Sequence, residues 1–170
     1  MDRLRRPLGQ AYAPHEHRPL GGYSGSMAMF ALASGGLASL IKATGRALPE
    51  RPALSDVVLL SVATHKLSRL LTKASVTSPL RAPFTRYAGP AGPGELMEEV
   101  RADGSGTRHA IGELVTCPFC MAIWAATALT GGLVLAPRAT RLVATVMTAV
   151  AASDFLQLAY AAAQDVHRRS

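Results

Sequence analysis

The sequence contains few of the residues that build a disulfide-bonded, nucleic-acid-binding or catalytic protein. Its 170 residues include only two cysteines, which cannot form a disulfide framework. Aromatic residues are scarce (4 Phe, 4 Tyr and 1 Trp), and the basic residues form no Lys/Arg tract, which argues against a nucleic-acid partner. We find no nucleophile with its base, phosphate-binding loop or nucleotide fingerprint, and the sequence therefore favours a non-enzymatic function with no catalytic residues.

Two long apolar runs dominate the C-terminal third of the chain. The run 118–136 carries no charge, and the run 142–163 carries one, at Asp154. A helix rises about 1.5 Å per residue, so the shorter run spans roughly 28 Å, close to the ~30 Å of a bilayer core. Neither run shows the alternation of a barrel strand. We therefore predict a membrane hairpin in which Pro137 ends the first helix and Thr140 caps the second. The alternative is a buried helical hairpin in a soluble protein.

The N-terminal third is less clearly organised. Residues 1–26 read as a mobile basic tail, in which His15 and His17 lack the further ligands of a metal site. The uncharged stretch 27–41 is short for a membrane span, and a signal sequence is its rival interpretation. It leads through a polar loop to residue 53.

A third apolar helix is expected at residues 56–72, with Ser55 as its N-cap. His65 and Arg69 recur every four residues and so share one face. We predict a span whose last two turns reach the lipid headgroups, and the alternative is a helix that lies shallow in the interface. The polar connection 73–115 follows, where the turn signal at residues 103–106 predicts a β-hairpin between residues 95–101 and 107–111.

These segments together predict an all-α integral membrane bundle of three to four spans with a polar connection that contains a hairpin. The membrane core covers residues 54–163, and a basic tail covers residues 164–170. The formal charge is +7, and with four spans the N-terminal tail, the connection and the C-terminus share one side, which the positive-inside rule makes cytoplasmic. If the stretch 27–41 does not cross, three spans remain and the N-terminal tail moves outside.

Several segments resemble a known family when they are taken together. They are Asp56-Val-Val-Leu-Leu, Ala63-Thr-His-Lys-Leu-Ser-Arg-Leu-Leu, Thr77-Ser-Pro-Leu-Arg-Ala-Pro-Phe, and Gly112-Glu-Leu-Val-Thr-Cys-Pro-Phe-Cys with Trp124. The chain resembles domain-of-unknown-function family 1360 over about residues 54–163. The resemblance implies a small bacterial integral membrane protein, in a family with some sporulation-linked members, and brings no biochemical activity with it. An acidic residue that the family often has before the Pro-Leu-Arg segment is Ala74 here.

Two groups of residues are candidate sites. Cys117 and Cys120 begin an apolar helix, and their spacing permits a redox pair, two ligands to one metal, or two reduced thiols packed at the interface. Asp154, with Gln157 one turn later, is costly in lipid unless it is paired or protonated, and we expect a polar network with Arg69 or His65. A proton or ion relay is the alternative for this network.

Two functions remain open at this point. The first is a non-enzymatic bacterial membrane protein that acts through membrane partners or membrane organisation, with both termini cytoplasmic. Its partners would be the bilayer and either a second copy or another membrane protein. The second is a thiol-dependent membrane protein that uses Cys117 and Cys120. No cofactor is identified, apart from the metal that these thiols would permit.

Overall fold

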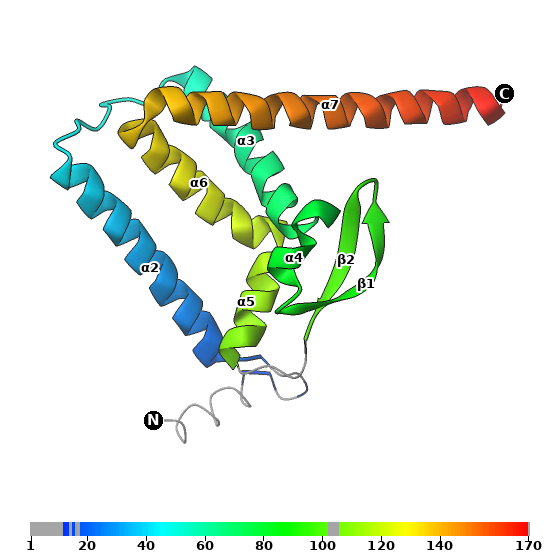
Figure 1. Ribbon diagram of the computed structural model, residues 1–170, viewed down its shortest axis with the longest axis horizontal. Helices are drawn as coiled ribbons and strands as arrows, with labels where there is room; N and C mark the ends of the chain where they lie inside the picture. The colour runs from blue at the N-terminus through cyan, green and yellow to red at the C-terminus, as the bar shows by residue number, and fades with distance from the viewer. Residues whose placement is uncertain (1–11, 14, 16–17, 102–105, 170) are drawn as a thin grey trace.

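The most apolar segments of the chain form long helices in the computed structural model, which describes residues 12–13, 15, 18–101 and 106–169 (Figure 1). These helices are α2 (Leu20–Ala43), α6 (Pro118–Leu135) and α7 (Pro137–Arg169). Each is long and apolar enough to cross a membrane. A further helix, α3 (Leu54–Thr72), carries Asp56, Lys66 and Arg69 and lies against α6 and α7.

Helix α2 begins at Leu20, earlier than the expected start at residue 27. Residues 20–26 lack apolar periodicity, and contact with α5 (Gly106–Thr116) accounts for their helical structure. The two backbones approach so closely that a Cβ on Gly22 would lie 2.1 Å from the carbonyl oxygen of Gly106. Only glycine fits at this position.

The predicted helix caps are wrong in two places. Ala136 alone separates α6 from α7, and Pro137 is the first residue of α7, where its missing N–H removes no helical hydrogen bond. Thr140 therefore lies inside α7 and packs against Gly132. Helix α3 begins at Leu54 with Ala53 at the N-cap position, so that Ser55 is already helical.

The small core lies where α3 packs between α6 and α7. Ala63 of α3 and Ala144 of α7 are fully buried, and Leu129 of α6 is 7% exposed. Small side chains let the helix backbones approach closely. Thr148 then donates a hydrogen bond from its Oγ1 to the Leu59 carbonyl oxygen, 3.2 Å away, across the α3–α7 interface.

The first half of α7 packs across α3, and the contacts advance along both helices in the same order. Arg141 near the start of α7 binds Asp56 through two hydrogen bonds of 2.8 Å. Asp154, about three and a half turns further along, binds Lys66. Beyond this contact α7 diverges from α3 and projects away from the other helices (Figure 1).

The polar connection contains the expected β-hairpin, but at different residues. Strand β1 (Thr85–Gly92) pairs antiparallel with β2 (Glu95–Val100), and Gly94 supplies the positive φ of +71° in the turn. The predicted second strand, residues 107–111, is wrong because it belongs to helix α5. The turn signal at 103–106 lies mostly outside the described residues. The Pro- and Gly-rich stretch 89–94 provides the reversal instead, because its glycines adopt the required backbone angles.

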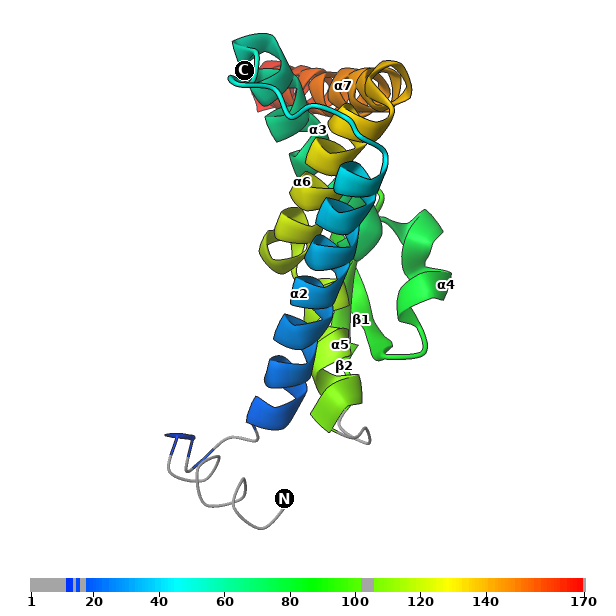
Figure 2. The same ribbon diagram turned by 90° about the vertical axis from the view of Figure 1, so that its left-hand side faces the viewer.

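Short helical segments, η1 (Ser75–Thr77) and α4 (Ser78–Arg81), join α3 to β1. Turning the molecule shows that α4 and the hairpin lie to one side of the long helices, with α5 beside the start of α2 (Figure 2). The opposite end carries the connections from α2 to α3 and from α6 to α7 (Figure 2). The polar elements are thus concentrated at one end of the long helices.

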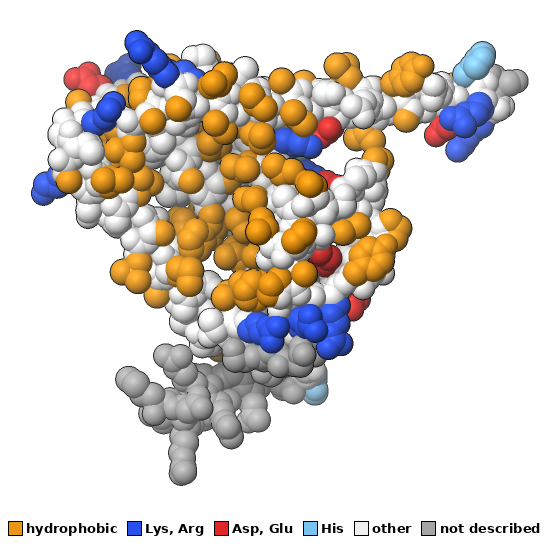
Figure 3. All heavy atoms as spheres, in the orientation of Figure 1, with side chains coloured by type: hydrophobic (Ala, Val, Ile, Leu, Met, Phe, Trp, Pro, Cys, Tyr) orange, Lys and Arg blue, Asp and Glu red, His pale blue; other side chains and the backbone are white. Residues whose placement is uncertain are grey.

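Large apolar side chains lie on the outside of the helices. In the most apolar 18-residue stretch of each helix, the buried share is 0% for α2, 17% for α6 and 11% for α7. Leu32 is 77% exposed, Phe119 90% and Leu156 71%. Hydrophobic side chains cover the middle of the face in Figure 3, with basic side chains above and below them. The buried residues are mainly small, and the large apolar residues point outward.

Candidate functional site

The second half of α3 presents three basic or titratable side chains to one region of the surface. His65, Lys66 and Arg69 lie within two turns of the helix, and residues three or four positions apart share a face. Helix α7 and the tip of the hairpin lie opposite this face and bring Asp154 and Glu95 to it. The site is therefore assembled from three separate parts of the chain.

Lys66 is the residue that pairs with Asp154. The expected partners were Arg69 and His65, and the structure corrects both. The contacts between α7 and α3 that begin at Arg141 and Asp56 continue to Asp154 and Lys66, while the His65 ring stacks on Phe155 with ring centroids 6.3 Å apart. Asp154 thus has the ion-pair partner that an acidic group in this helix requires. The partner is Lys66, which directly follows the expected residue His65 in the sequence.

Arg69 pairs with Glu95, the first residue of β2. Its Nε donates to Glu95 Oε1 at 2.9 Å, and its Nη2 donates to the second carboxylate oxygen, so the contact is bidentate. This partner could not be predicted from the sequence, because Glu95 reaches α3 only when the hairpin folds back. The pair ties the tip of the hairpin to the last turn of α3.

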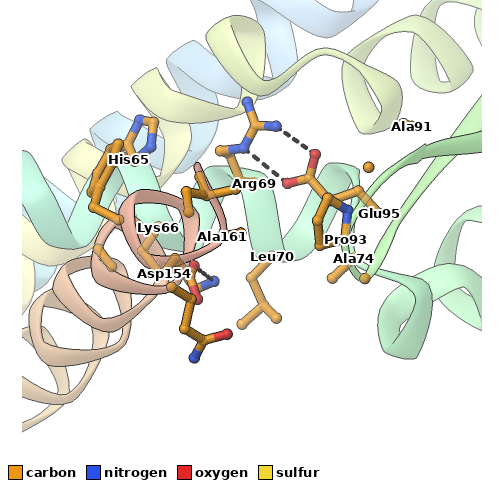
Figure 4. Close-up of a pocket in the computed structure, with 16 residues that line it drawn as sticks. His65, Lys66, Arg69, Leu70, Ala74, Ala91, Pro93, Glu95, Asp154 and Ala161 are labelled. Carbon is orange, nitrogen blue, oxygen red and sulfur yellow. Dashed lines mark hydrogen bonds and ion pairs between the residues drawn. The ribbon is translucent and has the colours of Figure 1, made fainter. Parts of the chain in front are cut away.

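The two ion pairs line one cleft of about 740 Å³ between α3, α7 and the hairpin tip. In Figure 4 the Lys66–Asp154 pair lies between His65 and the Arg69–Glu95 pair. Apolar residues from α3 and α7 complete the wall: Leu70, Ala151, Phe155, Leu158 and Ala161. Gln157 also lines the cleft, and its amide donates to Ser153 Oγ at 3.2 Å. The cleft thus combines paired charges with an apolar wall.

Arg81, in the Pro-Leu-Arg segment, holds the hairpin to the end of α3. It is 1% exposed and forms an ion pair with Glu98 of β2. Its guanidinium also donates to the carbonyl oxygens of Leu71 and Ala74, each at 3.0 Å, and to Thr77 Oγ1 at 2.7 Å. Arg81 belongs to the polar connection, where the sequence predicts a surface charge, whereas the structure makes it a buried structural residue.

The two cysteines lie at the start of α6, and neither lines the cleft. Cys117 is the N-cap, and its Sγ accepts a hydrogen bond from the Cys120 backbone N–H at 3.2 Å. Both thiols are free, with Cys120 exposed. Within residues 12–13, 15, 18–101 and 106–169, no group of three or more His, Cys, Asp or Glu residues is placed to hold a metal ion. Most of the His15–His17 stretch lies outside the described residues.

Most of the segments that carry the resemblance lie within a match to a known protein family. The family described as protein of unknown function (DUF1360) matches residues 59–160, which is more than half of the chain. The chain belongs to the DUF1360 family. The resemblance inferred from the sequence is therefore confirmed. The DUF1360 match contains all residues that line the cleft except Ala161.

A similar protein is the sporulation protein YjcA of Bacillus subtilis (strain 168), which is 35% identical to this DUF1360 chain over 71 residues. The aligned part is 41% of this chain and 60% of the relative, so the chain spans about three-fifths of the relative's length. No solved structure is significantly similar to this DUF1360 chain.

Proposed function

We propose that this DUF1360 chain is a bacterial integral membrane protein that acts without catalysis, through membrane partners or membrane organisation. The observation that carries the proposal is the distribution of apolar side chains. Small residues such as Ala63 and Ala144 fill the interior, while large apolar residues cover the outside of α2, α6 and α7. This distribution suits helices whose surroundings are lipid.

In water the same surface would be unfavourable. Monomeric soluble proteins rarely expose contiguous apolar patches larger than a few hundred Å². The outward faces of α2, α6 and α7 carry large apolar residues, including Met27, Leu40, Ile123 and Tyr160, each more than half exposed. A bilayer removes this cost because lipid tails contact such side chains without ordering water.

All four long helices cross the membrane in our proposal. Helix α3 is too polar to face lipid on all sides, but α6 and α7 cover it, and its charged residues have partners. Asp56 binds Arg141, Lys66 binds Asp154, and Arg69 binds Glu95. Pairing lowers the cost of placing these charges at membrane depth.

The hairpin, α4 and α5 then lie on the side of the N-terminal tail. The C-terminal end of α7 lies at the level of the opposite connections in Figure 1, so our arrangement requires α7 to turn toward the direction of α2 and α6 in the membrane and bring the C-terminus to the same side. The positive-inside rule makes this side cytoplasmic. Arg81 no longer counts toward the rule because it is buried with Glu98, but exposed Arg86 and the C-terminal Arg168 and Arg169 remain. The second half of α7 extends beyond the bundle and offers its surface to a membrane partner or a second copy.

The test is extraction combined with a topology map. We expect the expressed protein to stay in the membrane pellet at alkaline pH and to leave it only with detergent. Reporter fusions at residues 10, 90 and 168 should report one side, and fusions at residues 48 and 139 the other. A compact, monodisperse protein in the soluble fraction without detergent would refute the proposal. A reporter at residue 10 on the side of residue 48 would refute the crossing of α2.

A further inference from the structure

The cleft beside α3 holds equal numbers of positive and negative side chains. Lys66 and Arg69 supply the cations, and Asp154 and Glu95 supply the carboxylates. A ligand that carries only negative charge would draw Lys66 and Arg69 away from their carboxylates. It would leave the carboxylates of Asp154 and Glu95 without a positive partner. A ligand that carries one phosphate and one ammonium group offers a new partner to each side chain, because the phosphate takes the cations and the ammonium takes the carboxylates.

Both pairs can be reached from the cleft. The side chains of Lys66 and Asp154 are 21% and 47% exposed, and those of Arg69 and Glu95 are 42% and 23% exposed. Both pairs are only partly exposed, and at the level of the headgroups water and lipid heads can reach them, so that they can exchange partners at little cost. The Arg81–Glu98 pair differs, since its side chains are only 1% and 6% exposed.

The geometry of α3 suits a single phosphate group. Lys66 and Arg69 are three residues apart, a spacing that puts their Cβ atoms about 5–6 Å apart on one face of a helix. Both long side chains can therefore donate to oxygens of one phosphate, as cationic donors do in many phosphate sites. The cleft volume of about 740 Å³ lies within the range of small-molecule sites.

The apolar wall of the cleft points to an amphiphile. Phe155, Leu158 and Ala161 of α7 line the cleft beside the ion pairs, and the same helix exposes apolar residues on its outer surface. A ligand with a charged head and acyl chains would place its head at the ion pairs and its chains along α7. In our membrane arrangement this position lies where the last turns of α3 reach the headgroup region.

We propose that the cleft binds the headgroup of a phospholipid with a primary ammonium group, of the phosphatidylethanolamine class. The phosphate accepts hydrogen bonds from Lys66 and Arg69, and the ammonium donates to Asp154 and Glu95. His65, stacked on Phe155, lies beside the bound head. This inference rests on the proposed membrane function.

The test measures binding of fluorescent phosphatidylethanolamine to the full chain in neutral detergent, with four unlabelled competitors. Phosphatidylethanolamine should compete better than phosphatidylcholine, which has the same charge but no N–H donors, and better than phosphatidylglycerol, which is anionic. The expected margin is about tenfold or more, as for the loss of one charge-assisted hydrogen bond. Soluble phosphoethanolamine should compete far less well, because it lacks acyl chains.

Variants assign the binding to the cleft. The double variant Lys66→Gln/Arg69→Gln should lose binding of all the lipids, whereas Asp154→Asn/Glu95→Gln should lose only the preference for phosphatidylethanolamine over phosphatidylcholine. Ala161→Trp fills the cleft without a change of charge and should also abolish binding. Arg138→Gln is the matched control, because Arg138 is exposed and does not line the cleft. Helix content by circular dichroism confirms that each variant is folded.

Equal competition by phosphatidylcholine, or equal or better competition by phosphatidylglycerol, would overturn the inference. Equal competition by phosphoethanolamine would overturn the lipid assignment and make the ligand a soluble phosphate ester. Unchanged binding by the folded Ala161→Trp variant would also overturn it. Alkaline extraction of membranes from cells that express the protein distinguishes a failure of this inference from a failure of the proposed membrane function. A membrane-embedded protein without lipid preference loses only this inference, whereas a soluble protein loses the proposed function itself.

Discussion

Arg81 and Glu98 form an ion pair whose side chains are only 1% and 6% exposed. Three further hydrogen bonds join the Arg81 guanidinium to Leu71, Ala74 and Thr77, so that one side chain connects α3, η1 and β2. Full hydrogen bonding offsets much of the desolvation cost of the buried arginine. The Pro-Leu-Arg segment therefore positions the hairpin, and with it Glu95 at the cleft.

Replacement of Arg81 by Ala should destabilise the hairpin strongly. The variant leaves Glu98 buried without a partner, which typically costs about 3–5 kcal/mol. Hydrogen exchange of the amides in residues 85–100, measured in detergent, should rise sharply. Exposed Arg46, in the loop after α2, is the control, and its replacement by Ala should change little. The double variant Arg81→Met/Glu98→Leu should recover part of the loss, and no recovery would contradict the ion-pair explanation.

The importance of Arg81 could not be predicted from the sequence, for a physical reason. An arginine between prolines in a polar segment reads as a surface charge, and only the folded hairpin surrounds it with carbonyl oxygens and Glu98. The apolar runs were different, because their length and composition alone determine helices long enough to span a bilayer. Local properties were predictable from the sequence, and contacts between distant segments were not.

Asp154 illustrates the same limit within a single site. Its position in an apolar helix predicted that it needs a partner, but the helical spacing of α3 pointed to Arg69 or His65 and not to Lys66, which lies between them in the sequence. The choice depends on how α7 is turned relative to α3, which the short connection at Ala136 and the Arg141–Asp56 contact help to set. Glu95 was missed as a site residue because the hairpin was expected at later residues.

A charge exchange between Lys66 and Asp154 should test the α3–α7 contact. Each single reversal, Lys66→Asp or Asp154→Lys, places like charges together and should lower stability by about 1–3 kcal/mol, a usual range for disrupted ion-pair networks. The double variant Lys66→Asp/Asp154→Lys restores opposite charges and should recover most of the loss. Thermal unfolding in detergent gives the values. Asp165→Asn is the control, because Asp165 pairs with Arg168 on the exposed end of α7, where pairs contribute little.

Replacement of Cys117 and Cys120 should separate a structural role from thiol chemistry. The variant Cys117→Ser/Cys120→Ser should fold and reach the membrane normally, because serine also caps helices well. The variant Cys117→Ala/Cys120→Ala removes the side-chain cap seen at Cys117 and should lose about 1 kcal/mol. Metal analysis of the purified protein and thiol alkylation in cells complete the test. Bound metal, or cysteine oxidation that responds to stress, would support a thiol-dependent function instead.

The close contact between α2 and α5 can be tested with two glycines of α2, one at the contact and one away from it as the control. Gly22 and Gly25 both lie in α2, but a Cβ on Gly22 would meet the backbone of Gly106 at 2.1 Å, whereas a Cβ on Gly25 would have no atom within 4 Å. Gly22→Ala must push α2 and α5 apart and should destabilise the protein by about 1–3 kcal/mol, as overpacking does. Gly25→Ala should stabilise α2 by roughly 0.5–1 kcal/mol, because alanine favours the helix. Thermal unfolding of both variants in the same detergent measures the contrast. Equal effects of the two substitutions would mean that α2 does not rest on α5.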